Sequence, residues 1–136
     1  MKVLTIRWQR LVSQGRTCDR CGSTQLELER AMKVLTDALR PLGIEPRLQA
    51  GEIDQAAFAA DPAESNRIWI AGKPLEDWIT ADVGSSRCRS VCGESECRTV
   101  QVGGDDFEVI PERLIVKAAL RTASAMLDEE GAPEGT

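Results

Sequence analysis

A Cys-x-x-Cys pair, Cys18 and Cys21, constrains this chain more than any other feature of its sequence. The pair follows an apolar, strand-like run at residues 3–12 and precedes a long stretch with helical periodicity at residues 24–42. A dithiol at such a strand-to-helix turn can carry redox chemistry or supply half of a thiolate metal site. The pair therefore predicts an α/β arrangement built around reactive sulfur.

The residues around the pair favour an ionised sulfur. A helix N-terminus offers unpaired amide hydrogens and a partial positive charge, both of which stabilise a thiolate. Arg16 and Arg20 flank the cysteines and are expected to add to this effect, whereas the carboxylate of Asp19 opposes it. By position, Cys18 is the expected nucleophile and Cys21 the thiol that resolves the mixed disulfide.

A second group of thiols, Cys88, Cys92 and Cys97, brings the total to five cysteines, and the chain has no histidine. Cys–His catalysis and histidine metal ligands are therefore excluded. A site made of Cys18, Cys21 and two of the other three cysteines would hold zinc or a softer metal ion, either structurally or for metal handling. A third alternative is a relay in which a loop cysteine exchanges with the dithiol. The redox chemistry itself requires no cofactor.

Size and charge limit the remaining classes. A chain of 136 residues fits one domain, assigned to residues 1–127, and residues 128–136 are expected to form an acidic flexible tail. The net charge of -5 argues against a nucleic-acid partner. No apolar run approaches the ~20 residues that span a membrane, and charges interrupt the N-terminal run too early for a signal peptide. We expect a cytoplasmic protein with reduced cysteines.

Helix signals are clear in three places. Thr24 and Glu27 have capping-box spacing, which predicts that the first helix begins at Thr24. Asp54 is the expected N-cap of a short helix at residues 55–60, and Pro111 suits the first position of the final helix.

Strand signals complete the order of elements. Residues 81–96 have little periodicity and are expected to form a long loop. The expected strands cover residues 3–12, 44–50, 67–71, 97–102 and 107–110, the last two joined in a hairpin.

The apolar run, the dithiol and the amphipathic helix resemble the thioredoxin-like superfamily. Residues 1–127 are more closely similar to a small family of prokaryotic thioredoxin-like proteins of uncharacterised function, which have the CxxC and a cysteine-bearing loop. The residues that carry this similarity are Trp8, 17–22, 64–70, Gly72, 74–76, 84–86, 92–93 and 97–98.

The resemblance implies a thioredoxin-like three-layer sandwich in the order β-α-β-α-β-loop-β-β-α, with the cysteine loop inserted before the C-terminal hairpin. It also implies thiol–disulfide exchange with an unknown protein or small-molecule partner. Classical thioredoxins place a cis-proline before the third strand, and Ser65 and Asn66 stand there in this chain. These two residues are expected to hydrogen-bond a sulfur or a substrate backbone, and Trp69 is expected to line a cleft beside the dithiol.

Overall fold

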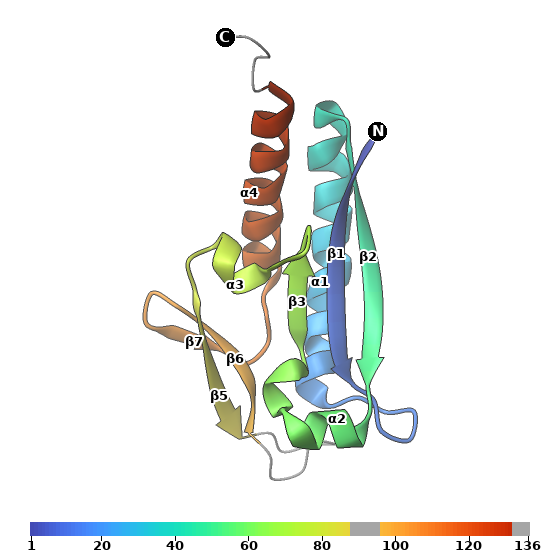
Figure 1. Ribbon diagram of the computed structural model, residues 1–136, viewed down its shortest axis with the longest axis vertical. Helices are drawn as coiled ribbons and strands as arrows, with labels where there is room; N and C mark the ends of the chain where they lie inside the picture. Colours follow the sequence, from blue (N-terminus) through green and yellow to red (C-terminus); the bar gives the residue numbers. More distant parts are fainter. Residues whose placement is uncertain (88–95, 132–136) are drawn as a thin grey trace.

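The main sheet of the protein has four strands, seen in a computed structural model that describes residues 1–87 and 96–131 (Figure 1). Its order is β2-β1-β3-β4. β1 and β2 are parallel, β3 is antiparallel to β1, and β4 is antiparallel to β3. The strands are β1 (Lys2–Leu11), β2 (Ile44–Ile53), β3 (Arg67–Ile70) and β4 (Lys73–Pro74). Pro46 lies in β2, an edge strand, where a missing amide hydrogen is tolerated.

Two long helices, α1 (Asp19–Leu39) and α4 (Glu112–Gly131), run side by side against one face of this sheet (Figure 1). In α1 the buried residues recur at helical spacing, so the helix presents one apolar face to the sheet. The core residues on that face are Leu28, Ala31, Leu35 and Leu39. They pack in one cluster with Leu4, Ile6 and Trp8 of β1 and with Ile115, Ala118 and Ala119 of α4.

The opposite face of the sheet is largely open. Val3 is 37% exposed and Arg7 is also exposed, because both alternate with the residues of β1 that point into the core. Near the end of β1 this face is covered, and there the Gln9 amide donates to the Glu64 backbone carbonyl at 2.8 Å. Among the described residues, the expected third layer is therefore confined to this end of the sheet, beside the short η2 helix (Pro62–Glu64).

A second sheet includes part of the expected long loop. It has the order β5-β6-β7, with β5 (Asp82–Arg87), β6 (Glu96–Val102) and β7 (Asp105–Phe107). The prediction of a loop over residues 81–96 was wrong for β5, which pairs along its whole length with β6. Residues 88–95 lie outside the described part of the chain.

The expected hairpin is present, but its turn is shorter than the connection at residues 103–106 that the expected strands imply, and its second strand was placed wrongly. Gly103 and Gly104 both have positive φ, which is the geometry of a two-residue hairpin turn. Pairing resumes directly at Asp105, opposite Val102, so the partner strand covers 105–107 rather than 107–110.

The first helix begins earlier than its capping signal predicted. Cys18 is the N-cap of α1, and Thr24 lies inside the helix with no exposed surface. Thr24 Oγ1 accepts the backbone N–H of Ile110, and Glu27 Oε1 accepts that of Glu112. The Thr-x-x-Glu pair thus binds amides at the start of α4, because packing of the two helices brings those unpaired donors to it.

The remaining connections follow their sequence signals. Asp54 caps α2 (Gln55–Ala60) by accepting the Ala57 N–H at 2.8 Å, as predicted. A 3-10 turn, η1 (Arg40–Leu42), links α1 to β2, and α3 (Leu75–Trp78) follows β4. Pro111 immediately precedes α4, one position before the expected place. α4 continues to Gly131 and so includes the start of the acidic segment, whereas residues 132–136 lie outside the described part.

A buried ion pair joins the second sheet to α3. Arg98 of β6 and Glu76 of α3 are 6% and 7% exposed, and their side chains are hydrogen-bonded. Arg98 also donates to the Ala63 carbonyl at 3.0 Å, and burial lowers the pKa of its guanidinium.

Across residues 1–87 and 96–131, no helix has the length and apolar character needed to cross a membrane.

Candidate functional site

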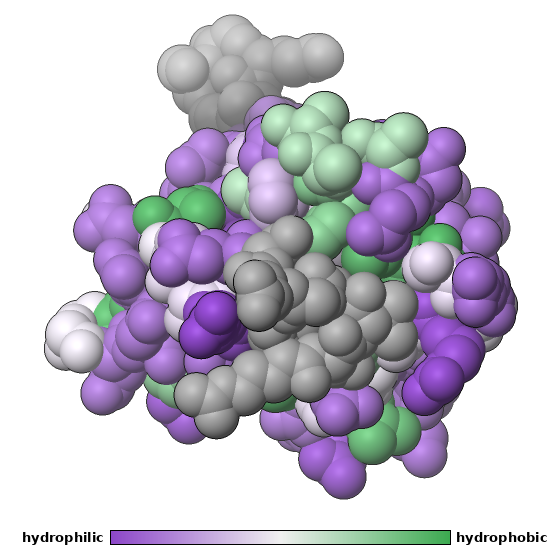
Figure 2. Space-filling model, turned by 90° about the horizontal axis from the view of Figure 1, so that it is seen from below, coloured by the Kyte–Doolittle hydropathy of each residue, from purple (hydrophilic) through white to green (hydrophobic). Residues whose placement is uncertain are grey.

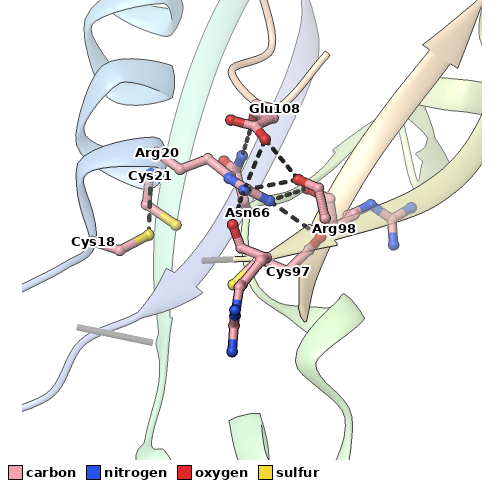
Figure 3. Close-up of polar contacts among 9 residues, drawn as sticks. Cys18, Arg20, Cys21, Asn66, Cys97, Arg98 and Glu108 are labelled. Atoms are coloured by element: carbon pink, nitrogen blue, oxygen red, sulfur yellow. Dashed lines mark hydrogen bonds and ion pairs between the residues drawn. The ribbon is translucent and has the colours of Figure 1, made fainter. Parts of the chain in front are cut away.

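The two cysteines lie together at the first turn of α1, close to the end of β1. The Cys18 side chain caps the helix, and its sulfur accepts the backbone N–H of Cys21 at 3.4 Å (Figure 3). An amide donor at a helix N-terminus favours negative charge on the sulfur that accepts from it. The expected position of the dithiol at a strand-to-helix turn is therefore found, with Cys18 rather than a later residue as the cap.

Cys21 is in the opposite electrostatic situation. Hydrogen bonding to the Cys18 sulfur, burial and the charge of Cys18 raise the pKa of the Cys21 thiol well above its usual range. Hydrogen bonds from Ser65 and Thr17 act in the other direction. Cys21 therefore keeps its proton while Cys18 is the sulfur suited to carry charge.

The segment expected to replace the cis-proline touches the dithiol. Ser65 Oγ lies 3.5 Å from Cys21 Sγ, which confirms the expected hydrogen bond to a sulfur. Asn66 makes no hydrogen bond to a sulfur of the described cysteines; its Oδ1 accepts from Trp8 Nε1 at 3.0 Å, and its Nδ2 donates to the Glu108 carbonyl at 3.4 Å. Asn66 has φ of 58°, a left-handed conformation that Asn tolerates better than most residues. These bonds hold Ser65 in place against Cys21.

Arg20 has a different role from the expected one. Its side chain is 8% exposed and leads away from the sulfurs toward Glu108 and β6 (Figure 3). It donates to the carbonyls of Cys97 at 3.1 Å, Arg98 at 3.3 Å and Arg87 at 3.2 Å. It also donates to Ser86 Oγ at 2.9 Å and pairs with Glu108 at 3.4 Å. Arg20 therefore binds the start of α1 to the second sheet.

Two other predicted residues are not brought to the dithiol. Arg16 is exposed, and its backbone pairs with Ser13 in the turn before Cys18. Trp69 lies on the open face of β3, opposite in register to Arg7, while its neighbours Ile68 and Ile70 face the core. Its ring lies under the guanidinium groups of Arg7 and Arg67. Trp69 thus faces away from the helix that carries the cysteines.

The second group of thiols is described only in part. Cys97 of β6 is 2% exposed, and its carbonyl accepts from Arg20, so β6 passes close to the start of α1. Cys88 and Cys92 lie outside the described residues. Within the described ranges, no group of three or more cysteines and carboxylates is placed to hold a metal ion.

Sequence reasoning did not single out Thr17 and Glu108. Thr17 Oγ1 donates to the Leu11 carbonyl at 2.9 Å, which ties the turn before Cys18 to the end of β1. Glu108 lies in the segment after β7. Its carboxylate pairs with Arg20 and accepts from Ser86, and its backbone carbonyl accepts from Asn66. The position of Thr17 beside the cysteines was an available signal, whereas nothing local distinguishes Glu108 from other exposed carboxylates.

The end of the molecule where α1 begins is mainly hydrophilic at its described surface, with a small pale-green apolar area (Figure 2). Ala56, Ala57, Ala59 and Ala60 of α2 are exposed there, and η2 leads from α2 to Ser65. Cys18 and Cys21 are each only 1% exposed.

Comparison with known proteins gives a family match whose range covers the residues of the described site. Residues 4–119 match a domain of unknown function, DUF2703. The chain belongs to the DUF2703 family. An uncharacterized protein of Archaeoglobus fulgidus is 42% identical over 112 residues, which cover 82% of each chain. No solved structure matches the chain. The matched range includes Cys18, Cys21, Ser65 and the second sheet.

Arg20→Lys is expected to lower the free energy of unfolding by about 3 kcal/mol, because a lysine cannot reproduce the planar donors and leaves buried carbonyls unpaired. Urea denaturation measures this loss. The matched control is Arg30→Lys, on the same helix but 65% exposed at its side chain, with an expected change within about 0.5 kcal/mol. Equal effects of the two substitutions would show that Arg20 does not hold the second sheet.

The raised pKa of Cys21 predicts a loss of stability in alkali. The ordinary pKa is 9.0; above it the unfolded chain releases this proton while the folded chain retains it. The stabilisation is therefore complete below about pH 9 and decreases by up to about 1.4 kcal/mol per pH unit above it. Reduced wild type and Cys21→Ser, unfolded in urea at pH 7 to 10.5, should differ by a constant amount at neutral pH and converge in alkali. Parallel curves throughout would contradict the raised pKa.

Proposed function

We propose that the protein is a thioredoxin-like thiol–disulfide oxidoreductase that uses Cys18 and Cys21 on a protein or small-molecule disulfide. The observation that carries the proposal is the difference between the two sulfurs. Cys18 accepts an amide hydrogen at a helix N-terminus, whereas burial and Cys18 raise the pKa of the Cys21 thiol. Such a pair separates an attacking sulfur from a resolving one.

The fold supports the same proposal. A strand, a dithiol and a helix, followed by a second parallel strand and two antiparallel strands, is the order on which the thioredoxin resemblance rests. In classical thioredoxins the helix begins at the first cysteine, and here α1 begins at Asp19 with Cys18 as its cap. The observed start of α1 therefore agrees with the resemblance better than the start at Thr24 that the capping box predicted.

The exchange takes place in two steps. The Cys18 thiolate attacks a partner disulfide, forms a Cys18–partner disulfide and displaces the other partner sulfur as a thiolate. Cys21 then attacks the Cys18 sulfur, the Cys18–Cys21 disulfide forms, and the released partner sulfur takes up the proton that Cys21 gives away. The partner is reduced and the dithiol oxidised, so no cofactor is needed. We place this cycle in the cytoplasm, where thiols are returned to the reduced state.

Burial adds a condition to the first step. Because Cys18 is 1% exposed, a partner disulfide reaches it only when the surface over it opens. Small disulfides should therefore react faster than a folded protein of equal reduction potential.

Cys18→Ser is expected to abolish exchange with a small aromatic disulfide while leaving the fold intact, because it removes the attacking sulfur. Cys21→Ser is expected to stop after the first step and to retain the mixed disulfide. Release of the coloured thiolate and the mass of the intact protein measure the two steps, and circular dichroism measures the fold.

Cys97→Ser is the matched control for the dithiol, because Cys97 is equally buried but lies on β6. It should retain both steps. A Cys18→Ser protein that still reacts at the wild-type rate, or a Cys97→Ser protein as inactive as Cys18→Ser, would show that the reacting sulfur is elsewhere.

A metal analysis separates this proposal from thiolate coordination. If the dithiol is free for exchange, reduced protein purified without chelators should contain less than about 0.1 metal ion per chain, since a structural zinc site is occupied stoichiometrically. Elemental analysis measures this content. About one zinc per chain, released by blocking the thiols, would assign Cys18 and Cys21 to a metal site with other cysteines and would overturn the redox proposal.

A further inference from the structure

The Ser65 hydroxyl lies between the end of β1 and the resolving cysteine. Its Oγ accepts the backbone N–H of Leu11 at 3.0 Å and lies 3.5 Å from Cys21 Sγ. Ser65 and Cys21 are both 1% exposed. The contact is therefore a buried hydrogen bond between a hydroxyl and a sulfur.

The charge of Cys21 determines the direction of this bond. A hydroxyl has one hydrogen and two lone pairs, and the Leu11 N–H uses one lone pair, which leaves the hydroxyl hydrogen available to the sulfur. Once Cys21 loses its proton, its sulfur can only accept, so Ser65 is then the donor. A donor of this kind interacts more strongly with a thiolate than with a thiol.

The position of Ser65 is fixed on both sides of the chain. Its own N–H donates to the Pro62 carbonyl at 3.2 Å, which closes η2. The next residue, Asn66, is held by the Trp8 indole at 3.0 Å. These contacts keep the hydroxyl in place when the sulfur changes charge.

From this geometry we propose that Ser65 is a positioning residue for the second step of exchange, in which its hydroxyl donates to the Cys21 sulfur as that sulfur attacks the Cys18–partner disulfide. The inference rests on the proposed exchange function and names the group that assists its resolving step. No described carboxylate is hydrogen-bonded to Cys21 in the structure, so the charge that develops on the attacking sulfur is met by a neutral donor.

Ser65 neither gains nor loses a proton in this step. Cys21 gives up its proton, its sulfur bonds to Cys18 Sγ, and the bond from Cys18 to the partner sulfur breaks. The partner sulfur leaves as a thiolate, and the proton from Cys21 passes to it or, where the partner thiol is acidic, to water. Ser65 keeps its hydrogen throughout and lowers the barrier by a hydrogen bond that strengthens as charge builds on Cys21.

The test uses the full-length reduced protein and dithiobis(nitrobenzoate), a disulfide that releases one coloured thiolate in each step. Ser65→Ala should leave the first release within about twofold of wild type and slow the second roughly tenfold, as expected for loss of one hydrogen bond to a charged group. Mass spectrometry of acid-quenched samples identifies the Cys18–Cys21 disulfide and thereby excludes contributions from the other cysteines. Ser65→Thr retains a hydroxyl and should restore the second release.

Thr122→Val is the matched control, since it removes another buried hydroxyl, bonded to the Ala118 carbonyl in α4 and remote from the dithiol. It should leave both releases unchanged. Equal slowing of both releases by Ser65→Ala, or an unchanged second release, would overturn the role of Ser65. If Ser65→Ala does not fold, a slow second release in Ser65→Thr that persists with a native circular dichroism spectrum would overturn it as well. A wild-type protein that forms no Cys18–Cys21 disulfide would instead contradict the exchange function itself.

Discussion

The guanidinium of Arg20 joins the parts of the molecule on which the site depends. Arg20 lies between the two cysteines in the sequence. Its guanidinium donates to three carbonyls of β5 and β6 and to Ser86, and it pairs with Glu108. A buried cation is tolerated only when its donors are satisfied in this way. The dithiol thus lies on a helix whose first turn is bound to the second sheet. Arg20 and its acceptors Cys97 and Arg98 are 77 and 78 residues apart in the chain.

That anchoring also explains which parts of the fold were predictable from sequence. α2, β3 and the Gly103-Gly104 turn follow from local signals, because a cap, an apolar alternation or two glycines act over a few residues. β5 was not predictable in this way, since Gly84, Ser85 and Ser86 have no strand periodicity of their own. It is a strand because it pairs with β6, a tertiary preference that overrides local propensity.

The candidate site divides along the same line. The adjacency of Cys18 and Cys21 follows from their spacing, and the Ser65 contact follows from the resemblance that placed Ser65 beside the dithiol. The role of Arg20 did not follow, because a cation beside a thiol in sequence has two possible partners, the sulfur or a distant carbonyl, and only the packing of α1 against the second sheet chooses between them. The same applies to Thr24 and Glu27, whose capping pattern is real but serves the amides of α4.

Anchoring and chemistry are therefore assigned to different residues of one turn. If Arg20 faced the sulfurs, its charge would stabilise both thiolates and reduce the difference between them. Because it faces the second sheet instead, the difference between the sulfurs is set by their immediate surroundings. The Cys21 amide donates to Cys18, while hydrogen bonding to Cys18 and burial raise the pKa of the Cys21 thiol and the Ser65 hydroxyl opposes this rise. Neutral donors are directional and short-ranged, so each acts on one sulfur. The two sulfurs therefore differ in their surroundings even though both are buried in the same apolar cluster, and the proposed exchange assigns the attacking role to Cys18 and the resolving role to Cys21.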